Sequence, residues 1–159
     1  MATPTYTLID STVLSSAASS VTFSSIPADY RDLVLVVEAS TTASGYSTLR
    51  ANSDSGSNYT YVHMNGNGSG TSSATGTAST LNLYPYFYAG NKNLVITQIM
   101  DYSATDKHKT ALARGNDPTT TGAYAIASRW ANTAAITSLT LAIADWAAGS
   151  TFYLYGIEA

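Results

Sequence analysis

The feature that most constrains the fold is a succession of short runs rich in Val, Ile, Thr, Tyr and Leu, separated by clusters of Gly, Asn, Ser and Pro. Such runs are typical of β-strands, and their regular spacing is typical of a sandwich or barrel. No window shows the i, i+3, i+4, i+7 apolar spacing of a helix, although the Ala content of 124–132 also permits a short helix. We expect strands at 4–9, 20–24, 32–39, 47–52, 58–64, 80–88, 93–101, 109–114, 123–130, 136–144 and 150–157.

Several of these runs alternate between apolar and other residues, which assigns them an inner and an outer face. In 136–144 we expect Leu139, Leu141 and Ile143 on one face, and in 150–157 we expect Phe152 and Leu154 on one face. The segment 33–37 is instead continuously apolar, which predicts a central strand that is buried on both faces.

A chain of 159 residues has the length of one domain and can bury a sizeable core without a metal or disulfide. We therefore predict a single all-β domain over 1–159. The segment 65–79 (NGNGSGTSSATGTAS) is of low complexity and contains two Asn-Gly steps suited to turns. We expect it to be a flexible loop inside the domain.

Composition excludes several classes of protein. Charged residues make up 11% of the chain, whereas about 25% is ordinary, and the few Lys and Arg are scattered, so we expect no nucleic-acid partner. No apolar run approaches the roughly 18 residues of a membrane span. There is no Cys and no signal peptide, so we expect the chain to be made in a cytoplasm. The 21 Ser and 23 Thr predict a neutral, hydroxyl-rich surface that favours association.

No catalytic constellation emerges, and we predict a non-enzyme without cofactor, metal or small-molecule substrate. His63 and His108 lack a neighbouring ligand or carboxylate, so we interpret them as a strand-face and a solvated histidine. The stretch NSDSGSN around Asp54 resembles a calcium loop faintly, but Gly56 is misplaced and no Glu closes it, which favours an Asx turn. A glycosidase needs two carboxylates about 5–9.5 Å apart, and the ten Asp and Glu offer no reason to choose a pair.

The candidate site is a stripe of tyrosines. Tyr84, Tyr86 and Tyr88 lie at period two on one strand face, and Pro85 predicts an edge strand because proline cannot donate to a ladder. Three interpretations remain open: the stripe is covered by the same chain, it forms a subunit interface, or it stacks on sugars. A second cluster, Tyr153 and Tyr155 with Trp146, is interpreted as core or sheet packing.

Three stretches carry a resemblance to a known group of proteins: SIPADYRDLVLVV (with Ile26, Pro27, Tyr30, Asp32 and Leu33), LRANSDSGSNYTYVHMNGNGSG, and RWANTAAITSLTLAIADWAAGSTFYLYGI. The chain resembles small β-rich virion proteins of tailed bacteriophages, especially phages of aquatic bacteria, over residues 5–157 with gaps in the Ser/Gly-rich middle. The resemblance implies a jelly-roll-like antiparallel β-sandwich. Its shared positions are packing positions, so it assigns no functional residue.

We therefore expect a structural virion protein, most concretely a head decoration or cement protein. Its expected partners are copies of itself, as a homotrimer, and the major capsid protein. The alternative hypothesis is a receptor- or carbohydrate-binding module of a tail fibre. A third hypothesis, from another class, is a hydrolase of cell-surface polymer.

Overall fold

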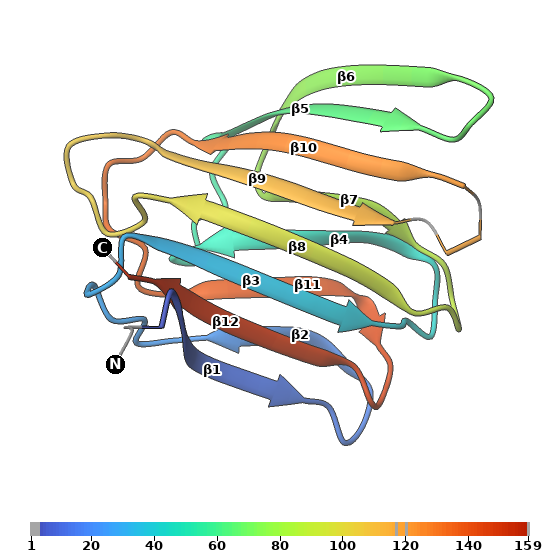
Figure 1. The fold of residues 1–159 in the computed structure, drawn as a ribbon, viewed down its shortest axis with the longest axis horizontal. Helices are drawn as coiled ribbons and strands as arrows, with labels where there is room; N and C mark the ends of the chain where they lie inside the picture. The colour runs from blue at the N-terminus through green and yellow to red at the C-terminus, as the bar shows by residue number, and fades with distance from the viewer. Residues whose placement is uncertain (1–3, 117, 120, 159) are drawn as a thin grey trace.

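The computed structural model describes residues 4–116, 118–119 and 121–158, and within 82–85 it describes the backbone. Twelve strands make up the fold (Figure 1). They are β1 (Tyr6–Val13), β2 (Ala18–Phe23), β3 (Asp32–Ala39), β4 (Gly45–Ala51), β5 (Tyr59–Gly66), β6 (Thr71–Ala78), β7 (Leu81–Phe87), β8 (Asn93–Met100), β9 (Lys109–Asn116), β10 (Ala123–Trp130), β11 (Leu139–Trp146) and β12 (Thr151–Ile157).

The strands form two sheets that pack face to face. The larger sheet has the order β1-β12-β3-β8-β9-β10-β5-β6, and the smaller sheet has the order β2-β11-β4-β7. Every ladder between two of these strands is antiparallel, and the described part of the chain contains no helix. The all-β, jelly-roll-like sandwich expected from the sequence is confirmed. Figure 1 also shows that the β5–β6 hairpin extends beyond the smaller sheet.

The core lies between the two sheets and follows the predicted alternation. Leu139, Leu141 and Ile143 of β11 are buried, as are Phe152 and Leu154 of β12. The largest buried side chains are aromatic or cationic, and they include Trp130, Trp146, Tyr59, Tyr102, Phe23, Phe87 and Lys109. Burial of one such aromatic ring contributes about 1.5–3 kcal/mol relative to leaving it exposed.

The expectation of a loop over 65–79 is wrong, because β6 occupies Thr71–Ala78 and pairs with β5 along its whole length. A tight turn joins the two strands. The Asn67 side-chain oxygen accepts hydrogen bonds from the amides of Ser69 and Gly70, both at 3.0 Å, and Gly68 supplies a φ of 83° that favours glycine. The Ser- and Thr-rich segment forms an exposed strand because its backbone hydrogen bonds are made with the neighbouring strand β5.

The first and third of the quoted stretches meet at one end of the sandwich. The ring of Tyr30 lies over Gly156, where a Cβ would come within 2.2 Å of the tyrosine ring. The buried Tyr102 hydroxyl donates a hydrogen bond to the carbonyl of Pro27. Asp32 accepts a hydrogen bond from the amide of Asp101 at 3.0 Å. The 26–32 segment is therefore held against Gly156 near the end of the chain and against residues 101–102, which lie outside the quoted stretches.

Candidate interaction surface

Tyr84 and Tyr86 of the predicted stripe lie on β7, which is an edge strand of the smaller sheet as expected, and Tyr88 follows the strand directly. Tyr86 and Tyr88 are half-buried, whereas Phe87 between them points into the core. The rings of Tyr86 and Tyr88 meet edge to face with their centroids 5.0 Å apart. The side chain of Tyr84 lies outside the described residues.

A third tyrosine that the sequence argument missed completes this cluster. Tyr46 lies opposite Tyr86 in the β4–β7 ladder, and their ring centroids are 4.9 Å apart at an interplanar angle of 77°. Tyr46 is 53% exposed. Only the pairing of β4 with β7 brings it there, since about 40 residues separate the two positions in the sequence.

The larger sheet presents a second and much wider surface. We call it the open face: the side of this sheet that points away from the smaller sheet. Two neighbouring cross-strand rows run along its middle. One row consists of Leu8, Tyr155, Val34, Gln98, Leu112, Ala127, Val62 and Thr75, and the other of Ser11, Tyr153, Val36, Ile96, Arg114, Ala125, Met64 and Ser73.

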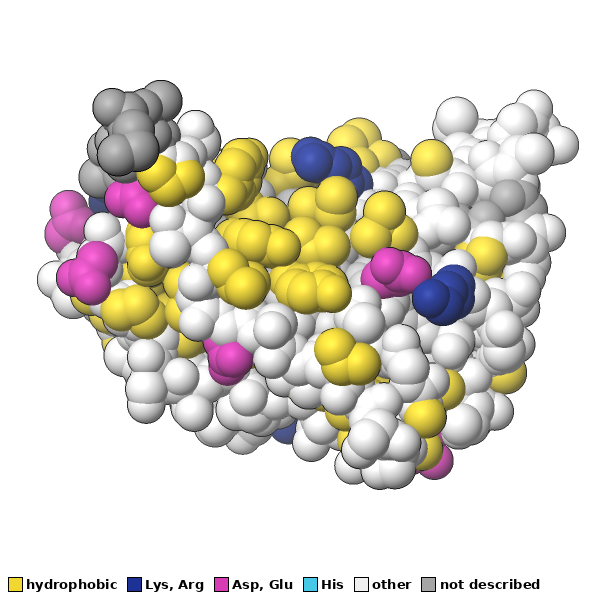
Figure 2. Space-filling model, turned by 60° about the horizontal axis from the view of Figure 1, so that its bottom comes forward, with side chains coloured by type: hydrophobic (Ala, Val, Ile, Leu, Met, Phe, Trp, Pro, Cys, Tyr) yellow, Lys and Arg dark blue, Asp and Glu magenta, His cyan; other side chains and the backbone are white. Residues whose placement is uncertain are grey.

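Exposed hydrophobic side chains concentrate on this open face. Nine large hydrophobic residues of the described chain are exposed, and by strand register all except Tyr46 point to the open face. The eight residues on the open face are Tyr6, Leu8, Val13, Val62, Met64, Leu94, Met100 and Leu112. Figure 2 shows part of this surface as one continuous hydrophobic patch with few charges inside it. Contiguous apolar patches of this kind mark interaction sites.

The open face has the dimensions of a protein interface. Eight strands about 4.8 Å apart span about 34 Å, and four outward residues along a strand span about 20 Å. The footprint of roughly 700 Å² approaches the roughly 800 Å² per partner of a standard interface.

The second aromatic cluster divides between core and surface. Trp146 is fully buried and contacts Phe87 and Phe152 edge to face at 5.2 and 5.1 Å. Tyr153 and Tyr155 instead lie half-buried on the open face, with nearly parallel rings 6.3 Å apart. Of the interpretation as core or sheet packing, the core half therefore holds for Trp146, whereas the two tyrosines pack against each other on the outer side of the sheet.

The expected two-sided burial of 33–37 is only partly found. β3 is a central strand between β12 and β8, and Leu33, Leu35 and Val37 are buried in the core. On the open face Val34 is covered by its neighbours, but Val36 is only half-buried. Within the described residues no third layer covers this side.

The Asp54 stretch forms an Asx turn. Asp54 Oδ1 accepts a hydrogen bond from the amide of Gly56 at 2.8 Å, and Oδ2 accepts one from the indole Nε1 of Trp130 at 2.7 Å. The indole bond, followed by the bonds from Asn58 and Gly56, lowers the pKa of Asp54 below its ordinary 3.8. The carboxylate thus anchors this loop to β10.

The two histidines lie apart from each other. His63 is half-buried, with its ring stacked on Tyr61 at a centroid distance of 6.3 Å. His108 is exposed in the loop before β9. Among the described residues, no group of three or more His, Cys, Asp or Glu side chains is placed to hold a metal ion, and no helix is long and apolar enough to cross a membrane.

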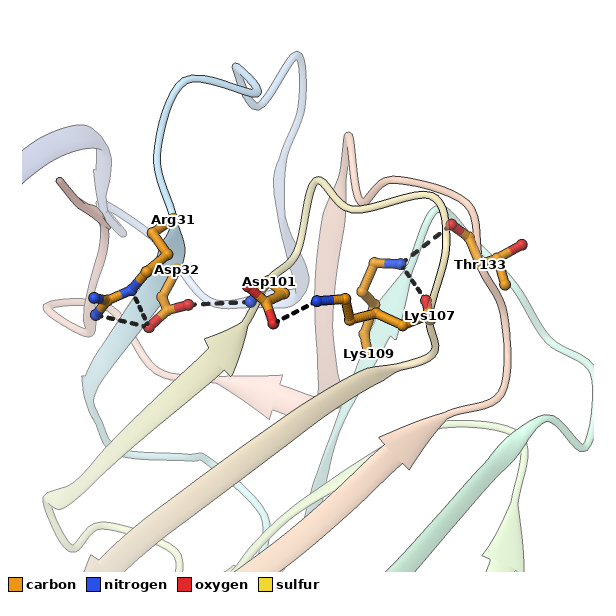
Figure 3. A network of polar contacts seen from close by, with 6 residues as sticks. All are labelled: Arg31, Asp32, Asp101, Lys107, Lys109 and Thr133. Atoms are coloured by element: carbon orange, nitrogen blue, oxygen red, sulfur yellow. Dashed lines mark hydrogen bonds and ion pairs between the residues drawn. The ribbon is translucent and has the colours of Figure 1, made fainter. Parts of the chain in front are cut away.

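One end of the larger sheet is held by polar contacts (Figure 3). The backbone amide of Asp101 donates a hydrogen bond to Asp32. The side-chain carboxylate of Asp101 pairs with Lys107 at 3.2 Å. Lys109 is buried, and its Nζ donates to the carbonyls of Lys107 at 2.9 Å and Thr133 at 3.2 Å. Burial lowers the pKa of Lys109. These contacts tie three loops together and border the open face.

Comparison with known proteins adds little. Neither a family model nor a curated protein matches the chain. The solved alginate lyase Aly36B is 7% identical, with a TM-score of 0.35 over 94% of this chain and 81% of that one. A variant of that lyase in complex with an alginate tetrasaccharide is also 7% identical, with a TM-score of 0.31 over 94% and 79% of the two chains. Likeness at these TM-scores assigns neither family nor activity.

Proposed function

We propose that the chain is a structural protein of a bacteriophage virion, and that it acts as a decoration or cement protein on the assembled head shell. The single observation that carries the proposal is the open face, where eight exposed large hydrophobic side chains share one side of one sheet. The sequence resemblance to virion proteins is the reason for proposing a phage particle as the assembly that this face binds. In this proposal the partner is the shell, and the copies cluster on it as a trimer.

Binding to the shell would stabilise it by mass action. A ligand that binds the assembled shell and not the free subunits stabilises the shell by RT ln(1 + [L]/Kd), which is about 2.7 kcal/mol for each site at a hundredfold excess over Kd. An apolar face of interface size suits this task, because it gains free energy only when a complementary surface covers it.

The test compares shells with and without the protein. We expect complete shells to withstand higher temperature, and Leu112→Glu to abolish binding because it places a charge in the middle of the open face. The matched control is Ser20→Glu, which adds the same charge to the exposed outer side of β2. Shells that are equally stable without the protein would exclude the cement role, and shell binding by Leu112→Glu would exclude the open face.

The tyrosine cluster favours a second candidate function, a receptor- or carbohydrate-binding module of a tail fibre. Tyr46, Tyr86 and Tyr88 form a compact aromatic group on the smaller sheet, away from the open face. Aromatic rings of this kind can stack on sugars. Glycan-array binding that is lost in Tyr86→Ala and kept in Leu112→Glu would support this function over the first.

A further inference from the structure

Arg114 occupies an unusual place on the open face. In its cross-strand row it lies between Ile96 of β8 and Ala125 of β10, so its guanidinium rises from an apolar surface. Arg114 and Ile96 also line the boundary between two hollows. The first hollow, of about 230 Å³, is otherwise lined by Tyr6, Val34, Val36 and Tyr155.

The second hollow, of about 610 Å³, lies on the other side of Arg114 and Ile96. Leu94, Asn116 and Tyr124 contribute to its walls. Glu38 and Lys92 also line the second hollow, where they pair with each other. Arg114 is the cation that both hollows share, and apolar walls with a few polar groups are usual in binding sites.

The charges near these hollows leave Arg114 as the available cation. Glu38 is paired with Lys92 at 2.8 Å, and Asp32 is paired with Arg31 at 3.2 Å. None of the ion pairs within the described ranges includes Arg114. A guanidinium offers five N–H donors in a fixed fork that matches a carboxylate, and apolar surroundings strengthen such a pair.

We propose that Arg114 and the two hollows form a binding site for a carboxylate carried by an apolar group. The inference rests on the proposed function and deepens it: the carboxylate belongs to the shell protein, whose apolar side chains enter the hollows. A carboxylate fits better than a phosphate, because one guanidinium balances one charge and the neighbouring Lys92 is already engaged by Glu38. A second copy of the same face fits less well, because it brings a second Arg114, and Glu38, the carboxylate among the described residues that line the hollows, is already paired with Lys92.

The first test uses small probes on the full chain. We expect 4-phenylbutyrate to shift the backbone amide NMR signals of Ile96 and Arg114 at concentrations at least threefold lower than the uncharged 4-phenylbutanamide. Arg114→Gln should remove this preference. The matched control Arg50→Gln, on the exposed side of the smaller sheet, should retain it. Equal shifts with both probes, or a preference that survives Arg114→Gln, would overturn the proposal.

The second test uses shells and separates this inference from the proposed function. Arg114→Gln should weaken shell binding tenfold or more and reduce its dependence on salt, whereas Arg114→Lys should weaken it less. An unchanged thermal transition in both variants shows that the fold is kept. If Arg114→Gln binds shells as tightly as the natural chain while Leu112→Glu does not bind, the carboxylate site is wrong and the open face stands.

Discussion

Replacing Gly156 by alanine tests whether the quoted motifs act through packing. A Cβ at this position would lie 2.2, 2.4 and 2.5 Å from three atoms of the Tyr30 ring, whereas ordinary contact begins near 3.4 Å. The ring would have to retreat by about an ångström. It has little freedom to do so, since the Arg31 amide donates to the carbonyl of Ile157 at 2.9 Å. Overpacking of this kind costs about 1–3 kcal/mol.

The assay is thermal unfolding followed by calorimetry. At about 2–4 °C per kcal/mol for a chain of 159 residues, we expect the Tm of Gly156→Ala to fall by roughly 3–10 °C. Gly70→Ala is the control, because nothing lies within 4 Å of its Cβ position, and it should change Tm by less than about 2 °C.

A double-mutant cycle decides the cause of the loss. In a Tyr30→Ala background the obstructing ring is gone, so Gly156→Ala should cost less than about 0.5 kcal/mol. If the cost is the same with and without the Tyr30 ring, the steric argument is refuted, and the glycine would be required for its backbone instead.

Three further predictions concern stability. The pKa of Asp54 is lowered in the fold, so its contribution to the free energy of unfolding is present above pH 3.8 and is lost as the pH falls through the lower folded value. Trp130→Phe should reduce this loss of stability at acid pH, measured by urea unfolding from pH 5 to 2. An unchanged pH dependence in the variant would contradict the prediction. Lys109→Met should speed amide exchange of Ala134 and its loop, because the bond to the Thr133 carbonyl is removed; unaltered exchange would show that the loop does not need it. Asn67→Ala should cost about 1 kcal/mol of hairpin stability, visible as faster amide exchange confined to β5 and β6, and exchange that rises throughout the sheet would count against a local role.

The sequence predicted the strands well where apolar residues alternate. Ten of the eleven expected ranges overlap one strand each at closely matching bounds, and 4–9 marks the first part of β1. The segment 124–132 forms strand β10 and no helix. β6 was missed because its Ser, Thr, Gly and Ala side chains carry no apolar signal, and its strand state depends on pairing with β5.

The candidate surface was harder to predict, because it depends on strand order and register. The pairing of Tyr46 with Tyr86 joins β4 to β7, and the row from Leu8 to Thr75 joins strands from the whole chain. Local patterning gives the parity of each side chain but not its cross-strand neighbours. The open face therefore emerged only when the sheet was assembled, although each of its residues was visible in the sequence.

The continuous apolar run of β3 is the one local signal that pointed to this face. Strands that are apolar on both parities occur where two layers cover a sheet, and β3, β8 and β12 all carry hydrophobic residues on the open face. Their inner side chains are covered by the smaller sheet, and the twelve described strands are all used in the two layers. This arrangement supports the proposal that a partner covers the open face. Burial of this face would contribute about 25 cal/mol for each Å² of apolar surface removed from water. We therefore expect related proteins that bind a partner through this face to keep apolar residues at the positions of Leu8, Leu112, Val62 and Met64. Related proteins that act as free monomers should carry polar residues there.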